Sequence, residues 1–472
     1  MMKRRQFIKM SASSLAATTI TSMTSLLSAL PAQAKVNDYK AMVCVFLYGG
    51  MDNHDTIIPY DNASYARWAD IRKDMVEAYP VPRRKENLLK INSSGRFGPR
   101  QFALPPEMKN IHALYQKGNA AIIGNVGPLH VPTNAEQYKR GSVSLPSRLF
   151  SHNDQQSTWM SGDTEGAQFG WAGRIHDKLL EQGTSQSNPF STITLSNGEL
   201  LISGKKTAPY HLIDGRAPDI TLTTPGVTGQ PDSESTYKGD ITSSVDGLPS
   251  DLKTYFSNDR QAIYSKPFER DLASKQAKSY SYNSHFNRVA SDKVSVQFPN
   301  THIGNQLKGV FSTILAQKQL GPNRQSFVVS MGGFDTHSGQ PESLSKLQTQ
   351  LDEAIGAFYN ALENHSLANQ VVSFTASEFG RTLACNGDGT DHGWGAHHFV
   401  IGESVRGGQI YGDLPKADFG HEYDAGNGRL IPTTSIDQYA ANFASWMGLE
   451  EKEIRKLFVN LDSLGVRPVF LV

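Results

Sequence analysis

Cysteine, excess charge of either sign and long apolar runs are all scarce in this chain of 472 residues. The two cysteines, Cys44 and Cys385, are too few for a disulfide framework. The 46 basic and 45 acidic residues nearly cancel, which excludes the basic signature of a nucleic-acid or membrane-surface protein. Beyond the N-terminal segment, no stretch approaches the roughly 20 apolar residues that a membrane-spanning helix needs. We therefore expect no nucleic-acid partner and no stable membrane anchor.

The first 34 residues have the composition of an export signal. Arg4 and Arg5 precede an apolar pair, an order that resembles a twin-arginine signal. An uncharged stretch over residues 11–30 follows, and small residues at 32–34 provide a cleavage site. The alternative, a membrane anchor, fits less well because the stretch is rich in serine and threonine. We expect the twin-arginine translocase to export the protein to the periplasm or beyond, and cleavage to leave residues 35–472 as a single domain.

Three apolar runs of strand length are each followed closely by an acidic residue. The runs that start at residues 41, 326 and 371 precede Asp52, Asp335 and Glu378 in turn. Continuous apolar runs are typical of parallel strands buried on both faces. The carboxyl ends of such strands share one edge of the sheet, where open α/β sheets bind ligands. We expect Asp52, Asp335, His337 and Glu378 to converge there, although each acid taken alone also fits an ordinary turn residue.

A short segment after the third run is dense in histidine and aspartate. It contains Asp391, His392, His397 and His398 and follows the glycine-rich residues 386–389. Imidazole and carboxylate are ligands for zinc, manganese or magnesium. We interpret the segment as a loop that supplies ligands to one or two divalent ions. A polar surface loop is the alternative, which fits less well because the segment holds three of the chain's 14 histidines.

A predicted helix start supplies further candidate catalytic residues. Ser151 fits a helix N-cap, with Asp154 three residues on. A helix N-terminus also suits a nucleophile or a bound anion, so Ser151 can fill both roles, with His152 as its activating neighbour. Arg381 has the forked geometry to pair with an anionic oxygen. The alternative for Arg381 is a structural ion pair with Glu378.

Helical spacing of apolar residues recurs between the predicted strands. The predicted helices cover residues 105–115, 302–320, 344–362 and 436–447. Residues 205–296 differ, because threonine, serine, glycine, proline and tyrosine dominate there. We interpret this part as a loop-rich insertion or cap with a few helices. The remainder fits one large α/β domain.

Six motifs in order carry a family resemblance: GGMD, LFSHNDQQ, GGFDTH, SEFGRT, DHGWGAHH and GRLIPTTSIDQYAANFASWMG. Together they resemble an exported bacterial family catalogued as domain of unknown function number fifteen-oh-one, within the alkaline-phosphatase-like and sulfatase-like superfamily. The resemblance spans about residues 40–449. It implies an alkaline-phosphatase-like three-layer α/β sandwich with a mostly parallel central sheet, an inserted loop-rich cap and a site at the carboxyl ends of the strands.

The resemblance also implies roles for individual residues. Asp52 matches the first metal-binding acid of the superfamily, and Ser151 matches its nucleophile. Asp335 and His337 match the next ligand pair, and Glu378 stands where an Asp-His pair is usual. The remaining ligands come from the later segment: Asp391, His392, His397 or His398.

Departures from the superfamily pattern bear on the number of ions and on the reaction. Asp335 and His337 are closer in sequence than the usual ligand pair, and Phe379 follows Glu378 where a histidine is usual. Neither cysteine lies in a Cys-x-Pro-x-Arg element, so a formylglycine sulfatase is not expected. We expect a metal-dependent hydrolase of phosphate or sulfate esters or related anionic groups, small or polymer-borne. The alternative is a non-catalytic exported binding or assembly protein on a decayed hydrolase fold.

Overall fold

The computed structural model describes residues 38–93, 95–218, 221–223, 234–236, 267–290 and 296–472. The predicted export signal and much of the predicted insertion lie outside the described residues. Residues Tyr39–Val472 form one compact unit. Among the helices described, none combines the length and the apolar character needed to cross a membrane.

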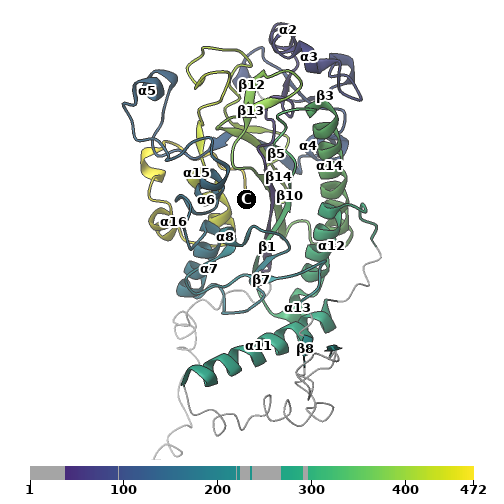
Figure 1. Cartoon of the computed structure of the whole chain (residues 1–472), viewed down its shortest axis with the longest axis vertical. Helices are drawn as coiled ribbons and strands as arrows, with labels where there is room; N and C mark the ends of the chain where they lie inside the picture. Colours follow the sequence, from purple (N-terminus) through teal and green to yellow (C-terminus); the bar gives the residue numbers. More distant parts are fainter. Residues whose placement is uncertain (1–37, 94, 219–220, 224–233, 237–266, 291–295) are drawn as a thin grey trace, which may run out of the picture. The chain divides into compact units, whose positions relative to one another are not determined.

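A mixed central sheet forms the middle layer of this unit (Figure 1). Its parallel half consists of β11 (Val371–Ala376), β1 (Lys40–Leu47), β10 (Arg324–Met331), β6 (Thr192–Thr194) and β7 (Tyr210–His211), in that order. The side chains of β10 and β11, and nearly all of those of β1, are buried, which explains why apolar residues predominate in the three predicted runs.

The other half of the sheet reverses direction. β14 (Ala396–Ile401) is antiparallel to β11 and to β5 (Ala120–Gly127). β15 (Ile410–Gly412) and β16 (Thr434–Ser435) then run parallel to β5. The expected α/β class with a mostly parallel sheet is therefore confirmed, with β14 set against its two neighbours.

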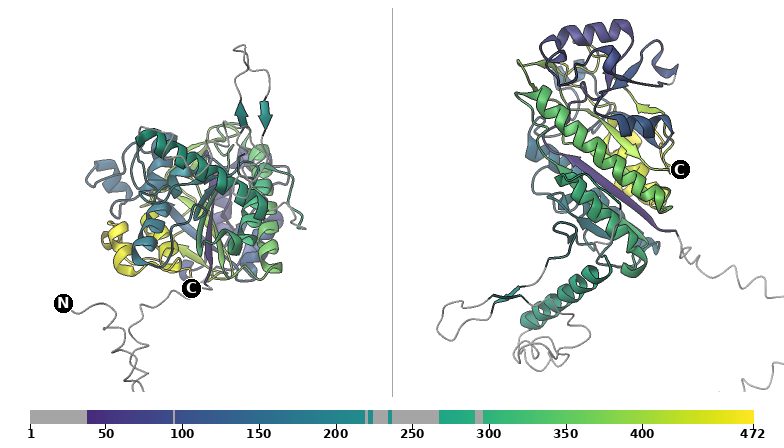
Figure 2. Two further views of the ribbon diagram at one scale, coloured as in Figure 1. Left: turned by 90° about the horizontal axis from the view of Figure 1, so that it is seen from below. Right: turned by 90° about the vertical axis from the view of Figure 1, so that its right-hand side faces the viewer.

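Helices cover both faces of the sheet. One face packs against α4 (Lys109–Gln116), α12 (His302–Leu315) and α14 (Gln340–Asn364). The other face packs against α6 (His152–Ser161), α7 (Trp171–Gln182), α8 (Glu199–Ile202), α15 (Ile436–Trp446) and α16 (Glu451–Leu457). Figure 2 shows α12 and α14 lying along the purple strand β1. The result is the expected three-layer arrangement.

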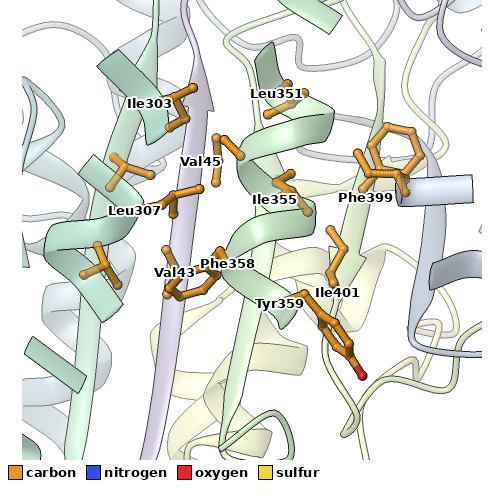
Figure 3. Close-up of a cluster of buried hydrophobic side chains, with 14 of the residues drawn as sticks. Val43, Val45, Ile303, Leu307, Leu351, Ile355, Phe358, Tyr359, Phe399 and Ile401 are labelled. Atoms are coloured by element: carbon orange, nitrogen blue, oxygen red, sulfur yellow. The ribbon is translucent and has the colours of Figure 1, made fainter. Parts of the chain in front are cut away.

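Successive residues of β1 serve the two cores in turn, because side chains of a strand alternate between its faces. Val43 and Val45 belong to the core under α12 and α14, whereas Met42, Cys44 and Phe46 belong to the opposite core. Figure 3 shows Val43 and Val45 against Ile303 and Leu307 of α12 and Leu351 of α14. The cysteine is thus buried core, as its sequence context predicts.

Smaller elements surround the three layers. A three-stranded sheet of β2 (Ile58–Pro59), β4 (Phe102–Leu104) and β3 (Leu89–Ile91) adjoins α2 (Asn62–Ile71) and α3 (Lys73–Val76). A ribbon joins β12 (Arg381–Cys385) to β13 (Thr390–His392). The remaining α-helices and strands of the described residues are α5 (Ala135–Arg140), β8 (Thr221–Thr223), β9 (Glu234–Thr236), α11 (Pro267–Val289) and α13 (Gln317–Leu320).

Two element predictions need correction. The helix expected over 302–320 divides into α12 and α13, which meet at Ala316. The segment interpreted as one ligand loop is largely strand, because Asp391 and His392 belong to β13 and the two later histidines to β14. The predicted helix over 436–447 starts at the expected residue, and Ser435 caps it through a reciprocal bond with Gln438.

Candidate metal centre at the carboxyl ends of the strands

Asp335 lies at the centre of a cluster of histidines just beyond the carboxyl end of β10. Its Oδ1 is 3.1 Å from Nε2 of His337 and 3.1 Å from Nε2 of His392. Its Oδ2 is 3.3 Å from Nε2 of His152. The three histidines come from the β10 loop, from β13 and from the start of α6. The fold therefore brings together residues that are up to 240 positions apart, and all four side chains are partly exposed.

The other ring nitrogen of each histidine is held by an acceptor. Nδ1 of His152 lies 2.9 Å from Oε1 of Glu378, and Nδ1 of His392 lies 2.9 Å from the carbonyl oxygen of Phe150. Nδ1 of His337 lies 3.3 Å from Oδ1 of Asp391. Carbonyl and carboxylate oxygens accept hydrogen bonds, so each ring can place a proton on Nδ1 and leave Nε2 free to ligate a cation. Nε2 of each ring faces Asp335, a contact that is favourable only with a proton or a cation between the nitrogen and the carboxylate.

This donor set fits a bound metal ion. Ligand atoms of His152, Asp335 and His392 all lie within 4.8 Å of one another, and His337 is next to two of them. Histidine ligands of metals usually donate their second N–H to a carboxylate or a carbonyl oxygen, as these three rings do. Three imidazoles and one carboxylate match zinc better than magnesium, which prefers oxygen ligands.

Electrostatics around Asp335 keep the carboxylate ionised. Burial alone would raise its pKa, but the hydrogen bond and charge of Arg381 outweigh burial and hold the pKa below its usual value. The hydrogen bond to Glu378 raises the pKa of His152, with a further contribution from Asp335. Burial lowers the pKa of His392. The carboxylates of Asp335 and Glu378 therefore attract positive charge. Either a second proton on His152 or a bound metal ion can provide it.

Glu378 is fully buried and acts on the cluster through His152. Its Oε1 accepts hydrogen bonds from Nε2 of Gln156 and from the backbone N–H of Gly49, as well as from His152. Gly49 has a φ of 113°, and a Cβ there would lie 2.2 Å from the backbone nitrogen of Asp335. The glycine after β1 is thus required for the close approach that joins Glu378 to the Asp335 loop.

Asp52 does not join this cluster. Its buried carboxylate accepts hydrogen bonds from the guanidinium of Arg72 at 2.6 and 3.2 Å and from Nε2 of Gln340 at 2.6 Å. Burial would raise its pKa, but the charge of Arg72 lowers it overall. The expected convergence of Asp52 with Asp335 is replaced by an indirect link, since Gln340 also accepts a hydrogen bond from Thr390, which bonds Arg381.

His397 and His398 also lie away from the cluster, inside the buried strand β14. Nδ1 of His397 accepts the backbone N–H of Asn125 at 2.9 Å, and Nδ1 of His398 is 3.4 Å from the hydroxyl of Thr375. Burial lowers the pKa of each ring to about 3. Both rings are therefore neutral core residues in this structure, which corrects their expected place in a ligand loop.

Ser151 and Arg381 have definite partners. Ser151 is the N-cap residue of α6, and its hydroxyl donates to Oδ2 of Asp154 at 2.9 Å instead of capping a backbone N–H. Arg381 is buried and donates to Oδ1 of Asp335 at 2.6 Å and to the carbonyl of Gly49 at 3.0 Å. Of the two alternatives for Arg381, an ion pair is found, but its partner is Asp335 and not Glu378.

Sequence reasoning missed several groups that organise the site. The carbonyl group of Phe150 belongs to the backbone, so a pattern of side chains cannot indicate its role. The only signal is that Phe150 lies in the same motif as His152. Phe150 adopts a left-handed backbone with φ of 72°, which is uncommon for a bulky residue and is typical of functional sites. Gln156 lies one helical turn after His152, a spacing that places both on one face.

A family model and several solved structures match this chain. Residues 275–450 match the family described as Protein of unknown function (DUF1501), which agrees with the expected resemblance over that part of the chain. The sequence matches no curated protein.

Solved structures show a distant similarity to sulfatases and phosphatases. A sulfatase from Pseudoalteromonas sp., PsFucS1, is 9% identical with a TM-score of 0.34, over 89% of this chain and 70% of that one. The C-terminal periplasmic domain of EcEptC from Escherichia coli, in complex with Zn, is 10% identical with a TM-score of 0.35, over 93% and 92% of the two chains. Likenesses at this level assign no activity to this chain.

Proposed function

We propose that the cluster around Asp335 binds a divalent metal ion, with zinc the best match, and that the protein is an exported hydrolase of phosphate or sulfate esters or related anionic groups. One observation supports this most strongly. Three histidines have Nδ1 held by acceptors and Nε2 turned toward a single carboxylate. Such an arrangement is typical of metal ligands and their supporting shell.

The residues divide into ligands and groups that orient them. His152, His392 and Asp335 are the primary ligands, and His337 completes the set. Glu378 and Asp391 orient His152 and His337 and so act as positioning residues, a different role from the direct ligation expected from sequence. An ion held there would polarise an ester oxygen and stabilise the charge that develops on it.

Ser151 is the proposed nucleophile. It lies between Phe150, whose carbonyl bonds His392, and His152, so the backbone places it beside the cluster. The Asp154 carboxylate accepts the hydrogen bond of the Ser151 hydroxyl and is positioned to receive its proton during attack. Arg148 contacts Asp154 at 3.5 Å and its side chain is 71% exposed, which supplies a positive charge for an anionic substrate.

A non-catalytic binding or assembly protein remains the second candidate. The observation in its favour is that Arg72 and Gln340 occupy the Asp52 carboxylate, which leaves fewer free ligands than the resemblance implies. In that case the metal would be structural, and the cluster would hold the loops after β10 and β11 together.

Turnover of chromogenic esters by zinc-loaded protein separates the two candidates. We expect hydrolysis of p-nitrophenyl phosphate or p-nitrophenyl sulfate, and a loss of about 1000-fold or more in Ser151→Ala. Asp335→Ala should lose both metal and turnover. Zinc-loaded protein that hydrolyses neither ester nor a polymeric sulfate or phosphate ester would support the binding protein instead.

A further inference from the structure

A cavity of about 310 Å³ lies near the amino ends of the parallel strands, whereas the metal cluster lies beyond their carboxyl ends. It is lined by His176 of α7, by Ser187 and Ser191 before β6, and by Tyr210 and Tyr282. β10 has 8 residues, and at about 3.3 Å per residue it separates the two ends by roughly 25 Å. The cavity is therefore independent of the cluster, and its volume is at the lower end of the range for small-molecule sites.

The lining of the cavity is polar but nearly uncharged. Hydroxyl, amide and imidazole groups predominate, and none of its lining residues is acidic. The single cationic residue, Lys206, is bonded to Glu181 at 3.0 Å. Burial lowers the pKa of His176 to about 3, so its ring is neutral at physiological pH. A charged ligand would find no free counter-charge among these groups.

Several polar groups of the lining are available to a ligand. Nε2 of His176 is bonded to the hydroxyl of Ser326 at 2.8 Å, which leaves Nδ1 without a partner in the described structure. The Ser187 and Ser191 hydroxyls likewise have no hydrogen bond there, although Ser191 is buried. Neutral donors and acceptors in a small, partly open cavity match the hydroxyl groups of a polyol.

Aromatic rings give the cavity an apolar wall. Tyr210 and Tyr282 both pack on Phe190, with ring centroids 5.0 and 6.1 Å away. The Tyr210 hydroxyl donates to Asn283 at 2.6 Å, so that ring is fixed. Tyr282 is 36% exposed and offers a ring at the cavity wall. A ring beside clustered hydroxyls is complementary to a sugar, which has C–H faces and O–H edges.

We propose that this cavity binds one neutral monosaccharide unit, free or as part of a glycan. The site does not rest on the proposed hydrolase, because none of its residues contacts the metal cluster. Its polar groups would bond the sugar hydroxyls, and Tyr282 would stack on the ring. The structure thus combines a saccharide site near the amino ends of the parallel strands with a candidate metal site beyond their carboxyl ends.

Saturation-transfer NMR on the full chain tests this with D-glucose, D-galactose, D-mannose and N-acetylglucosamine as separate probes. We expect saturable binding of at least one of them, weakened about tenfold in Tyr282→Ala and several-fold in Ser191→Ala. Tyr60→Ala, a partly exposed tyrosine elsewhere, is the matched control and should bind as the wild type does.

Two outcomes would overturn the proposal: no saturable binding of any of the four sugars, or equal affinity in wild type and Tyr282→Ala. Asp335→Ala distinguishes this site from the hydrolase, since it should lose zinc and keep sugar binding. Circular dichroism of each variant confirms that a loss of binding is not a loss of fold.

Discussion

The orientation of the His152 ring determines what the cluster can bind. Glu378 fixes that ring through a 2.9 Å hydrogen bond with Nδ1 and is itself fixed by Gly49 and Gln156. Phe150 and Asp391 act in the same way on the other two rings. Preorganised imidazoles bind metal more tightly than free ones because less reorientation is needed on binding.

Glu378→Gln tests this positioning role. The amide keeps the shape of the side chain but removes the negative charge that supports His152. We expect zinc affinity to fall about 10- to 100-fold while the fold survives. Competition with a chromogenic chelator measures the affinity. Glu363→Gln, at the exposed end of α14, is the control, and equal zinc affinity in Glu378→Gln and wild type would contradict the role.

A second residue-scale prediction concerns acid stability. His398 is buried with a pKa of about 3, whereas an unfolded histidine titrates near about 6.5. Because the unfolded state binds the proton more readily, stability is full above about pH 6.5 and falls as the pH is lowered toward the folded value, by ~1.4 kcal/mol per pH unit for each such ring.

His398→Phe should reduce this pH dependence by that amount, because Phe does not titrate. Urea unfolding at pH 7, 6, 5 and 4.5 measures it in wild type and variant. The same variant should keep its zinc, since His398 is outside the cluster. Parallel stability curves for the two proteins would contradict the prediction, and a loss of zinc would restore His398 as a ligand.

At the scale of elements, one helix is capped by another. α4 has no side-chain cap of its own at Met108. Instead Asp352 of α14 accepts the backbone N–H groups of Asn110 and Ile111 at 2.9 and 2.8 Å. The carboxylate thus satisfies two donors at the helix start and ties the two helices together.

Asp352→Ala should therefore lower the free energy of unfolding by about 1–2 kcal/mol at pH 7, because it leaves these donors without a partner. Urea denaturation gives the value. Glu353→Ala, an exposed neighbour on the same helix, should change stability by less than about 0.5 kcal/mol. A loss no larger than that of the neighbour would show that solvent caps α4 equally well.

The strands that position the site could be predicted from the sequence. β1, β10 and β11 each contain a run of mainly apolar residues because both of their faces are buried, and glycines follow the first two. β14 was missed, since its two buried histidines make a strand resemble a polar loop. The sequence pattern does not show that the two rings form hydrogen bonds with Asn125 and Thr375 on neighbouring strands.

The partner of Asp52 could not be predicted from the sequence. Asp52 and Asp335 follow the same pattern: strand, two glycines, one residue, acid. Asp335 meets three histidines, whereas Asp52 meets Arg72, which lies 20 positions later at the end of α2. The packing of α2 against β2 and β12 brings Arg72 to Asp52, and that packing is a tertiary property.

At the scale of the whole molecule, the cluster joins segments from α6, the β10 loop and β13. An ion bound there links parts of the chain that separate on unfolding, so binding and folding are coupled. Zinc at about 100 times its Kd should stabilise the protein by ~2.7 kcal/mol. Removal by a chelator should lower the Tm, and re-addition should restore it.

Differential scanning calorimetry checks this coupling. The Tm of Asp335→Ala should not respond to zinc or to the chelator, which separates binding at the cluster from unspecific effects. An equal zinc response in wild type and Asp335→Ala would place the ion elsewhere in the molecule.

The zinc content of purified wild type, Asp335→Ala and His398→Phe, measured by mass spectrometry after zinc loading and gel filtration, tests the central claim most directly. The cluster predicts stoichiometric zinc in wild type and in His398→Phe, and none in Asp335→Ala with its fold intact. Wild-type protein without zinc, or Asp335→Ala that keeps it, would contradict the assignment of this cluster as the metal centre.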